Sequence, residues 1–173
     1  MKIEAKNIKI AKFASEETLC FEATIYVDGK KVGTAHNHGQ GGNTDVHFDD
    51  REFQKKVETY CKSLPPIVSD TMMDPHDESK PFSYPQDLEN LIDGLINDFD
   101  NQKEIKRIEK KIQKEATKGS FFRLEGENEP LCYRTIAANG EKAKAFLDKK
   151  YPNKYRFVTA EELLNEAKKL MSA

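Results

Sequence analysis

At 173 residues, the chain is long enough for one ordinary domain or two small ones. Its 28 basic and 30 acidic residues give a net charge of -2, which excludes a global attraction to nucleic acid or to an anionic membrane. A hydrophobic content of 37% and a charged content of 34% exclude a disordered composition and indicate a well-solvated protein with a modest core.

Cysteine usage and the lack of long apolar runs predict a cytoplasmic protein. Cys20, Cys61 and Cys132 are odd in number, far apart and free of any C-x-x-C pair, which is typical of a reducing compartment. No stretch approaches the roughly 20 apolar residues that cross a bilayer. The first residues also lack the apolar run of a secretory signal.

The first 48 residues predict an antiparallel β-sheet. A strand is expected over 6–13, and residues 19–27 alternate between apolar and polar with the period of a half-buried strand. Asp28-Gly29 is typical of a tight hairpin turn, so we expect a return strand over 31–38. A glycine-rich loop and a short strand at 46–48 follow.

A helix and a linker are predicted next. Asp49-Asp50-Arg51-Glu52 has the spacing of a capping box in which the Asp49 carboxylate accepts from the backbone three residues on. The helix ends at Pro65-Pro66. Segment 69–84 is rich in Pro, Asp and Ser, which predicts a linker between an N-terminal β-rich domain, 1–68, and a C-terminal domain, 85–173.

A long helix is predicted over 85–118, either continuous or broken near Asp100-Asn101. Its apolar stripe is wide at first and thin in the second half. The second half should therefore protrude or pair with another helix, so a homodimer through the long helix is one partner hypothesis.

The remaining residues predict a ββαβα module. Two strands over 121–124 and 131–136 precede a helix capped by Asn139, a short strand over 155–158 and a terminal helix opened by the capping box Thr159–Glu162. The apolar positions expected to pack in these two helices are Ala143, Phe146 and Leu147, and Leu163, Leu164, Ala167 and Leu170. The fold class is therefore α+β: an N-terminal antiparallel sheet with one packed helix, a long charged central helix and this C-terminal module.

Residues 35–49 contain three of the four histidines around the glycine-rich loop. His36 and His38 lie two apart on a strand and share a face, so His47 or Asp49 would complete a three-ligand zinc site with an open position. Strand pairing decides whether this site is accessible. A two-residue turn places His36 opposite Phe21 on the apolar face, whereas a three-residue loop turns both histidines outward.

Three other interpretations of this loop stay open. Successive N–H groups from Gly39 to Thr44 would cradle a phosphate, although the Lys-Ser/Thr pair of a P-loop is missing. Gln40, Asn43 and the histidines would instead offer neutral hydrogen-bonding groups to a protein partner. In the third interpretation, the loop is an irregular connection between two strands and has no binding role.

The long helix is polarised in charge, with acidic residues before residue 101 and mainly basic residues after it. This order complements the helix macrodipole, which is a sufficient structural cause. The alternative is that these groups dock a partner of opposite charge. Aromatic residues do not interleave with the basic run, so direct nucleic-acid binding is not expected. The residues concerned are Asp87, Glu89, Asp93, Asp98 and Asp100, and Lys106, Arg107, Lys110, Lys111 and Lys114.

Three segments of the first half, Ser15–Phe21, Tyr26–Lys30 and Asn37–Gly42, resemble segments of small uncharacterised accessory proteins encoded by tailed bacteriophages. The resemblance covers about the first fifty residues. It implies a protein made during infection, hence located in the host cytoplasm. Many such proteins bind and inhibit a host factor such as a protease, a nuclease or a defence component.

We therefore expect a non-enzymatic, protein-binding inhibitor or modulator of a host factor that needs no cofactor. Motifs of nucleophilic or zinc catalysis, such as G-x-S-x-G and H-E-x-x-H, do not occur. The alternative is metal- or phosphate-dependent binding or hydrolysis of a small molecule at His36, His38 and His47, with zinc as the metal.

Overall fold

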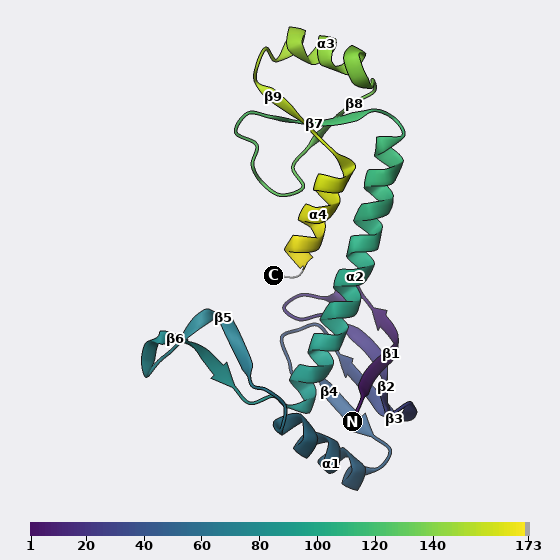
Figure 1. The fold of residues 1–173 in the computed structure, drawn as a ribbon. Helices are drawn as coiled ribbons and strands as arrows, with labels where there is room; N and C mark the ends of the chain where they lie inside the picture. The colour runs from purple at the N-terminus through teal and green to yellow at the C-terminus, as the bar shows by residue number, and fades with distance from the viewer. Residues whose placement is uncertain (172–173) are drawn as a thin grey trace. The chain divides into compact units, whose positions relative to one another are not determined.

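The computed structural model describes residues 1–171, with all side chains except those of Asp70 and Thr71. These residues form four α-helices and three antiparallel sheets, which confirms the α+β class (Figure 1). The chain divides into two compact parts, Met1–Asp100 (unit 1) and Asn101–Ala173 (unit 2). This division falls within helix α2 (Leu88–Ala116) and not in segment 69–84.

Unit 1 contains a four-stranded antiparallel sheet in the order β1-β2-β3-β4. The strands are β1 (Ile3–Ile10), β2 (Phe21–Val27), β3 (Lys30–Asn37) and β4 (Asp45–Phe48). Helix α1 (Arg51–Lys62) and the first half of α2 pack against the apolar face of the sheet. The buried core includes Phe21, Ile25, Phe48, Val57, Cys61, Ile92 and Ile96.

The hairpin between β2 and β3 settles which way the histidines face. Its turn has two residues, Asp28-Gly29, both with positive φ, as the sequence predicted. A β-bulge between Ile25 and Tyr26 then shifts the register by one residue, so that His36 pairs with Glu22. His36 therefore faces outward, although the turn is of the length that we expected to bury it.

Helix α1 is capped one residue later than predicted. The carboxylate of Asp50, and not that of Asp49, accepts from the backbone N–H groups of Glu52 and Phe53 at 2.9 and 3.1 Å. Because the acceptor lies two and three residues before its donors, this is an ordinary N-cap without the reciprocal bond of a capping box.

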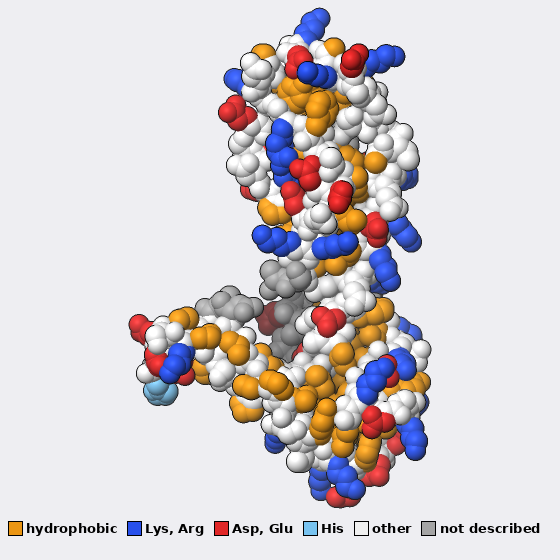
Figure 2. All heavy atoms as spheres, viewed as in Figure 1, with side chains coloured by type: hydrophobic (Ala, Val, Ile, Leu, Met, Phe, Trp, Pro, Cys, Tyr) orange, Lys and Arg blue, Asp and Glu red, His pale blue; other side chains and the backbone are white. Residues whose placement is uncertain are grey.

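The long loop predicted for 69–84 is wrong, because the chain forms a hairpin of β5 (Ile67–Asp74) and β6 (Asp77–Tyr84). The two strands form a two-stranded sheet of their own. The Pro, Asp and Ser content predicted a linker, but both strands of such a sheet are edges, where the missing N–H of Pro81 is tolerated. Hydrophobic side chains lie at the surface along this hairpin (Figure 2), and those of Val68, Met72 and Met73 are about half exposed.

Unit 2 has the predicted ββαβα order after α2. Its elements are β7 (Ser120–Leu124), β8 (Arg134–Ile136), α3 (Gly140–Lys150), β9 (Tyr155–Val158) and α4 (Ala160–Met171). The three strands pair in the order β8-β7-β9. Helix α2 is continuous over 29 residues, which decides between the two predicted alternatives in favour of one unbroken helix.

The helices of unit 2 pack on both faces of its sheet. Phe121 lies on the face covered by the second half of α2 and by α4, together with Ile112 and Leu163. Its neighbour Phe122 points the other way, where its ring lies 6.2 Å from that of Tyr151 at the end of α3. Ala143 and Leu147 are the buried residues of α3.

Two apolar residues of these helices do not pack as predicted. Phe146 on α3 is 52% exposed, and Leu170 in the last turn of α4 is 45% exposed. Each lies three residues after a buried alanine of its own helix. The apolar spacing therefore included both residues in the predicted packed face, although they lie at its edge. Within residues 1–171, each helix is too short or too polar to cross a bilayer.

Candidate functional site

One buried side chain, Asn37, joins two loops of unit 1 that are distant in sequence. Its Oδ1 accepts from the Thr18 hydroxyl and from the Gly39 N–H, both at 2.8 Å. Its Nδ2 donates to the Gly42 carbonyl at 2.9 Å and to the Thr44 hydroxyl at 3.2 Å. An amide offers two lone pairs and two hydrogens, so Asn37 is fully occupied in positioning the loops.

Gly39 makes the second link between these loops. Its carbonyl oxygen accepts from the N–H groups of Glu16 and Glu17 at 2.8 and 3.1 Å. Its φ is 87°, and a Cβ at this position would overlap the carbonyl oxygen of Ala14. Glycine is therefore required here both by backbone conformation and by space.

Acidic residues of α2 bind the same loop. The Glu89 carboxylate accepts from the Thr44 N–H at 2.9 Å, and the Asp93 carboxylate accepts from the Thr44 hydroxyl at 2.6 Å. Burial raises the pKa of Asp93, the Thr44 bond partly offsets this, and the like charge of Asp87 adds to the rise. The glycine-rich loop and the acidic half of the long helix were predicted as separate candidate sites. In the structure they lie together.

A cavity of about 500 Å³ opens where these segments meet, and we call it the acidic cleft. Carboxylates and apolar side chains share its lining. The lining residues used below are Glu16, Glu17, Asp93, Leu19, Phe21 and Ile96. Such a mixture suits a cation with an aliphatic stem, because the stem packs on the apolar wall while the charge meets the carboxylates.

The glycine-rich loop is poorly suited to phosphate in this conformation. The Gly39 N–H already donates to Asn37 and the Gly41 N–H to the Thr18 hydroxyl, so these donors are in use. The neighbouring carboxylates also have the same sign as a phosphate. The geometry therefore favours a cationic ligand.

Most of the other predicted acidic residues hold unit 1 together. Asp87 caps α2 by accepting from the Asn90 N–H at 2.7 Å. Asp100 forms an ion pair with Lys12 at 3.0 Å. Asp98 is exposed on α2, as are Gln40 and Asn43 on the glycine-rich loop.

The predicted histidine cluster lies on the outer face of the sheet. The rings of His36 and His38 meet edge to face at 5.1 Å between centroids, and His36 Nε2 lies 3.5 Å from an Asp45 carboxylate oxygen. His47 is exposed on β4, where it pairs with Thr34. In the part of the chain that the structure describes, no three His, Cys, Asp or Glu side chains are placed to hold a metal ion.

The predicted basic residues of α2 lie in unit 2 and are exposed. Arg107 is held by Glu104 one turn earlier at 2.6 Å, and the Nζ of Lys111 lies 5.9 Å from the centroid of the Tyr133 ring. The remaining ones are Lys106, Lys110 and Lys114. These are ordinary contacts of a solvated helix face.

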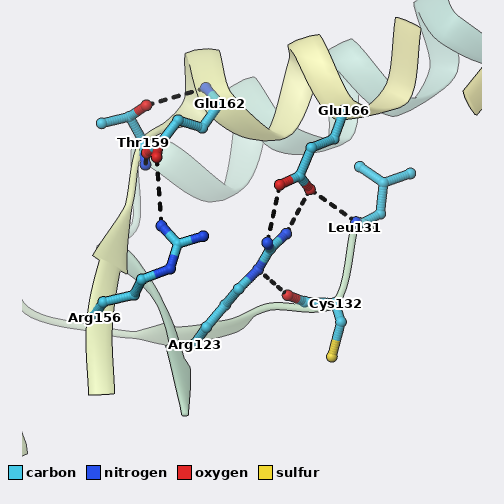
Figure 3. Close-up of polar contacts among 7 residues, drawn as sticks. All are labelled: Arg123, Leu131, Cys132, Arg156, Thr159, Glu162 and Glu166. Carbon is cyan, nitrogen blue, oxygen red and sulfur yellow. Dashed lines mark hydrogen bonds and ion pairs between the residues drawn. The ribbon is translucent and has the colours of Figure 1, made fainter. Parts of the chain in front are cut away.

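A buried ion pair organises unit 2 (Figure 3). Both guanidinium ends of Arg123 donate to the Glu166 carboxylate, and its Nε donates to the carbonyl of Cys132. The same carboxylate accepts from the Leu131 N–H at 3.0 Å. The Arg123 side chain is only 4% exposed. The Leu131 N–H and the Cys132 carbonyl bond to these side chains, and the Cys132 N–H donates to the Glu129 carbonyl in a turn, which explains why β8 is shorter than predicted.

Acid is expected to weaken unit 2 through this pair. The Arg123 guanidinium and the Leu131 N–H lower the pKa of Glu166 from its ordinary value of 4.5, against the opposing effect of burial. Stability from a carboxyl with a lowered folded-state pKa is present above the unfolded value and is lost as pH falls through the folded one. Urea unfolding at pH 6 and at about pH 3.5 should therefore show a larger loss for the wild type than for Glu166→Gln. Equal losses would contradict this assignment.

No family model, curated protein or solved structure matches the chain.

The structure also reveals a charge division that the net charge conceals. Unit 1 carries 11 Lys and Arg against 19 Asp and Glu, a net charge of -8. Unit 2 carries 17 against 11, a net charge of +6. The sequence contains this division, since it appears when charges are counted for each half separately. In contrast, a single sequence does not indicate that residues 15–19 and 37–44 both lie against α2.

Proposed function

We propose that the chain is a non-enzymatic, protein-binding inhibitor or modulator that receives a basic side chain of a host factor in the acidic cleft. The acidic cleft carries this proposal, because it combines the carboxylates of Glu16, Glu17 and Asp93 with an apolar wall. A lysine or arginine of a partner matches both features.

The charge of unit 1 supports a partner with a basic surface. A net charge of -8 over 100 residues attracts positively charged proteins over distances of about a Debye length, roughly 8 Å at physiological salt. Enzymes that bind nucleic acid carry such basic grooves. Among the expected classes of host factor, a nuclease therefore fits the charge best.

The hairpin β5–β6 offers a second contact surface for a protein. An isolated two-stranded hairpin is marginally stable in water, and this one exposes Val68, Met72 and Met73. Methionine side chains adapt to varied apolar surfaces and are frequent at binding sites. Covering these side chains would stabilise both the hairpin and the complex.

The resemblance to phage accessory proteins supports a protein of the bacterial host as the partner. Such a protein is expected to act in the host cytoplasm on a protease, a nuclease or an anti-phage defence component. Affinity capture from bacterial lysate, with the full chain as bait, would identify this host factor as a stoichiometric partner.

The acidic cleft can be tested by removing charge without removing volume. In the double variant Glu16→Gln/Glu17→Gln, we expect affinity for the captured factor to fall by about 30-fold or more, since removing one charge of an ion pair that the complex desolvates costs about 2 kcal/mol or more. Titration of purified factor by calorimetry at two salt concentrations measures this change. The loss should be smaller at high salt, where the wild-type attraction is already screened.

A charge-matched control separates the acidic cleft from the general field of unit 1. Glu22→Gln/Glu52→Gln removes the same charge from exposed positions on β2 and α1. Equal affinity losses in both double variants would contradict the proposal that the acidic cleft binds the partner. Stoichiometric zinc that disappears in His36→Ala would instead support the alternative function at the histidines.

A further inference from the structure

We propose that α3 and the turn after it bind single-stranded nucleic acid, with Phe146 stacking on a base and Lys142, Lys149 and Lys150 contacting phosphates. This activity is separate from the proposed protein binding, because it resides in unit 2 and uses none of the residues of the acidic cleft.

Phe146 is an exposed aromatic residue of α3, and three lysines occupy neighbouring positions on the helix surface. Its side chain is 52% exposed, although alanine would cost the helix less at a solvent-facing position. Lys142, Lys149 and Lys150 lie four residues before it and three and four residues after it, which are the neighbouring positions on a helix surface. The Nζ of Lys150 lies 5.8 Å from the Phe146 ring centroid and 5.3 Å from that of Tyr151.

Positive charge outweighs negative charge around Phe146. Residues 140–157 contain six Lys and Arg against two acidic residues, Glu141 and Asp148, and one of the six, Arg156, pairs with Glu162 at 3.4 Å. The Asp148 carboxylate accepts a hydrogen bond from the Tyr155 hydroxyl at 2.8 Å. Lys and Arg side chains project from the end of unit 2 that carries α3, together with a few Asp and Glu side chains and beside exposed hydrophobic atoms (Figure 2). This surface is therefore suited to a polyanion.

The combination of residues favours nucleic acid over protein as the ligand. Lysine is depleted at the centre of protein interfaces, whereas phosphates are contacted mainly by lysine and arginine. An aromatic ring among such lysines is the arrangement used for unpaired bases, because every base has a π-face. A duplex keeps its bases stacked inside and cannot use the ring, so a single strand is the matching ligand.

Nucleic-acid binding was not expected from the sequence, because aromatic residues do not interleave with the basic run of α2. They do interleave over residues 146–157, where Phe146, Tyr151, Tyr155 and Phe157 alternate with basic residues. Phe146 occupies an apolar position of the α3 pattern, so the sequence alone does not distinguish it from a core residue.

The test is fluorescence anisotropy of the full chain with labelled oligothymidylate and oligouridylate of about 15 nucleotides, a length that spans one small binding surface. Phe146→Ala is expected to weaken binding about 5- to 100-fold, and Phe146→Trp to retain it. Lys149→Gln/Lys150→Gln should make the logarithm of affinity less dependent on the logarithm of salt by roughly 1.4 units of slope, about 0.7 for each lysine that contacts a phosphate of a single strand. Tighter binding of one oligonucleotide identifies DNA or RNA as the preferred strand.

The control is Lys106→Gln/Lys110→Gln, which removes the same charge from α2, on the other face of the sheet of unit 2. It should bind within about threefold of the wild type. Circular dichroism shows whether each variant is folded, and the exposed position of Phe146 makes misfolding of its variants unexpected. The proposal is overturned if the wild type does not bind, if folded Phe146→Ala binds like the wild type, or if the control loses as much affinity as Lys149→Gln/Lys150→Gln.

Discussion

Replacing Glu166 with alanine is expected to destabilise unit 2 by about 3 kcal/mol, because the Arg123 guanidinium would remain buried without its partner. The Arg123 side chain is 4% exposed and that of Glu166 is 28% exposed, so the expected cost lies at the lower end of the range for broken buried pairs. The variant also leaves the Leu131 N–H without its acceptor. Urea unfolding and hydrogen exchange of β7 and α4 would measure the loss.

Two further variants test the cause of this effect. Glu161→Ala removes an exposed acidic residue from the first turn of the same helix and should change stability by less than about 0.5 kcal/mol. The double variant Arg123→Met/Glu166→Leu removes both charges and should be more stable than Glu166→Ala. If the double variant is no better than the single one, lost packing and not the unpaired charge is responsible.

Gly39→Ala is expected to destabilise unit 1 by about 3 kcal/mol or more, since a Cβ cannot be placed there without moving the backbone. It would overlap the Ala14 carbonyl oxygen and lie 2.9 Å from the Cβ of Cys20. Relief of this overlap requires the loops joined through Asn37 to separate. Affinity for the protein partner should therefore fall together with stability. Thermal unfolding and calorimetric titration would measure the two losses.

Gly42→Ala is the matched control in the same loop. A Cβ at Gly42 meets nothing within 4 Å, and its φ is not in the left-handed region. Its stability should stay within about 0.5 kcal/mol of the wild type. Similar losses in the two variants would mean that chain flexibility, and not the close contact at Gly39, limits the loop.

Local sequence patterns predicted the elements of the fold well where a residue acts on its immediate neighbours. The capping box Thr159–Glu162 is confirmed, because the Thr159 hydroxyl accepts from the Glu162 N–H at 3.1 Å and the Glu162 carboxylate accepts from the Thr159 N–H at 2.7 Å. Asn139 occupies the predicted cap position of α3, but its Oδ1 accepts from the Ser120 hydroxyl across the fold. The Asn139 side chain thus bonds to a distant strand instead of capping its own helix, which is the role that the local pattern predicted.

The candidate site was harder to predict because it depends on pairing between distant segments. The outward direction of His36 follows from a single bulge near Ile25, which no turn motif signals. The acidic cleft requires Thr44 to lie against Glu89 and Asp93, more than forty positions away. Periodicity describes which face of an element is apolar, but it does not state which elements meet.

The opposite charges of units 1 and 2 mean that one isoelectric point describes this molecule poorly. An overall pI near 6 suggests weak electrostatic behaviour, yet each half carries a substantial field of its own. Dissolved ions screen both fields at once. A rise in ionic strength is therefore expected to weaken both proposed interactions in the same step, that of unit 1 with a basic protein and that of unit 2 with single-stranded nucleic acid.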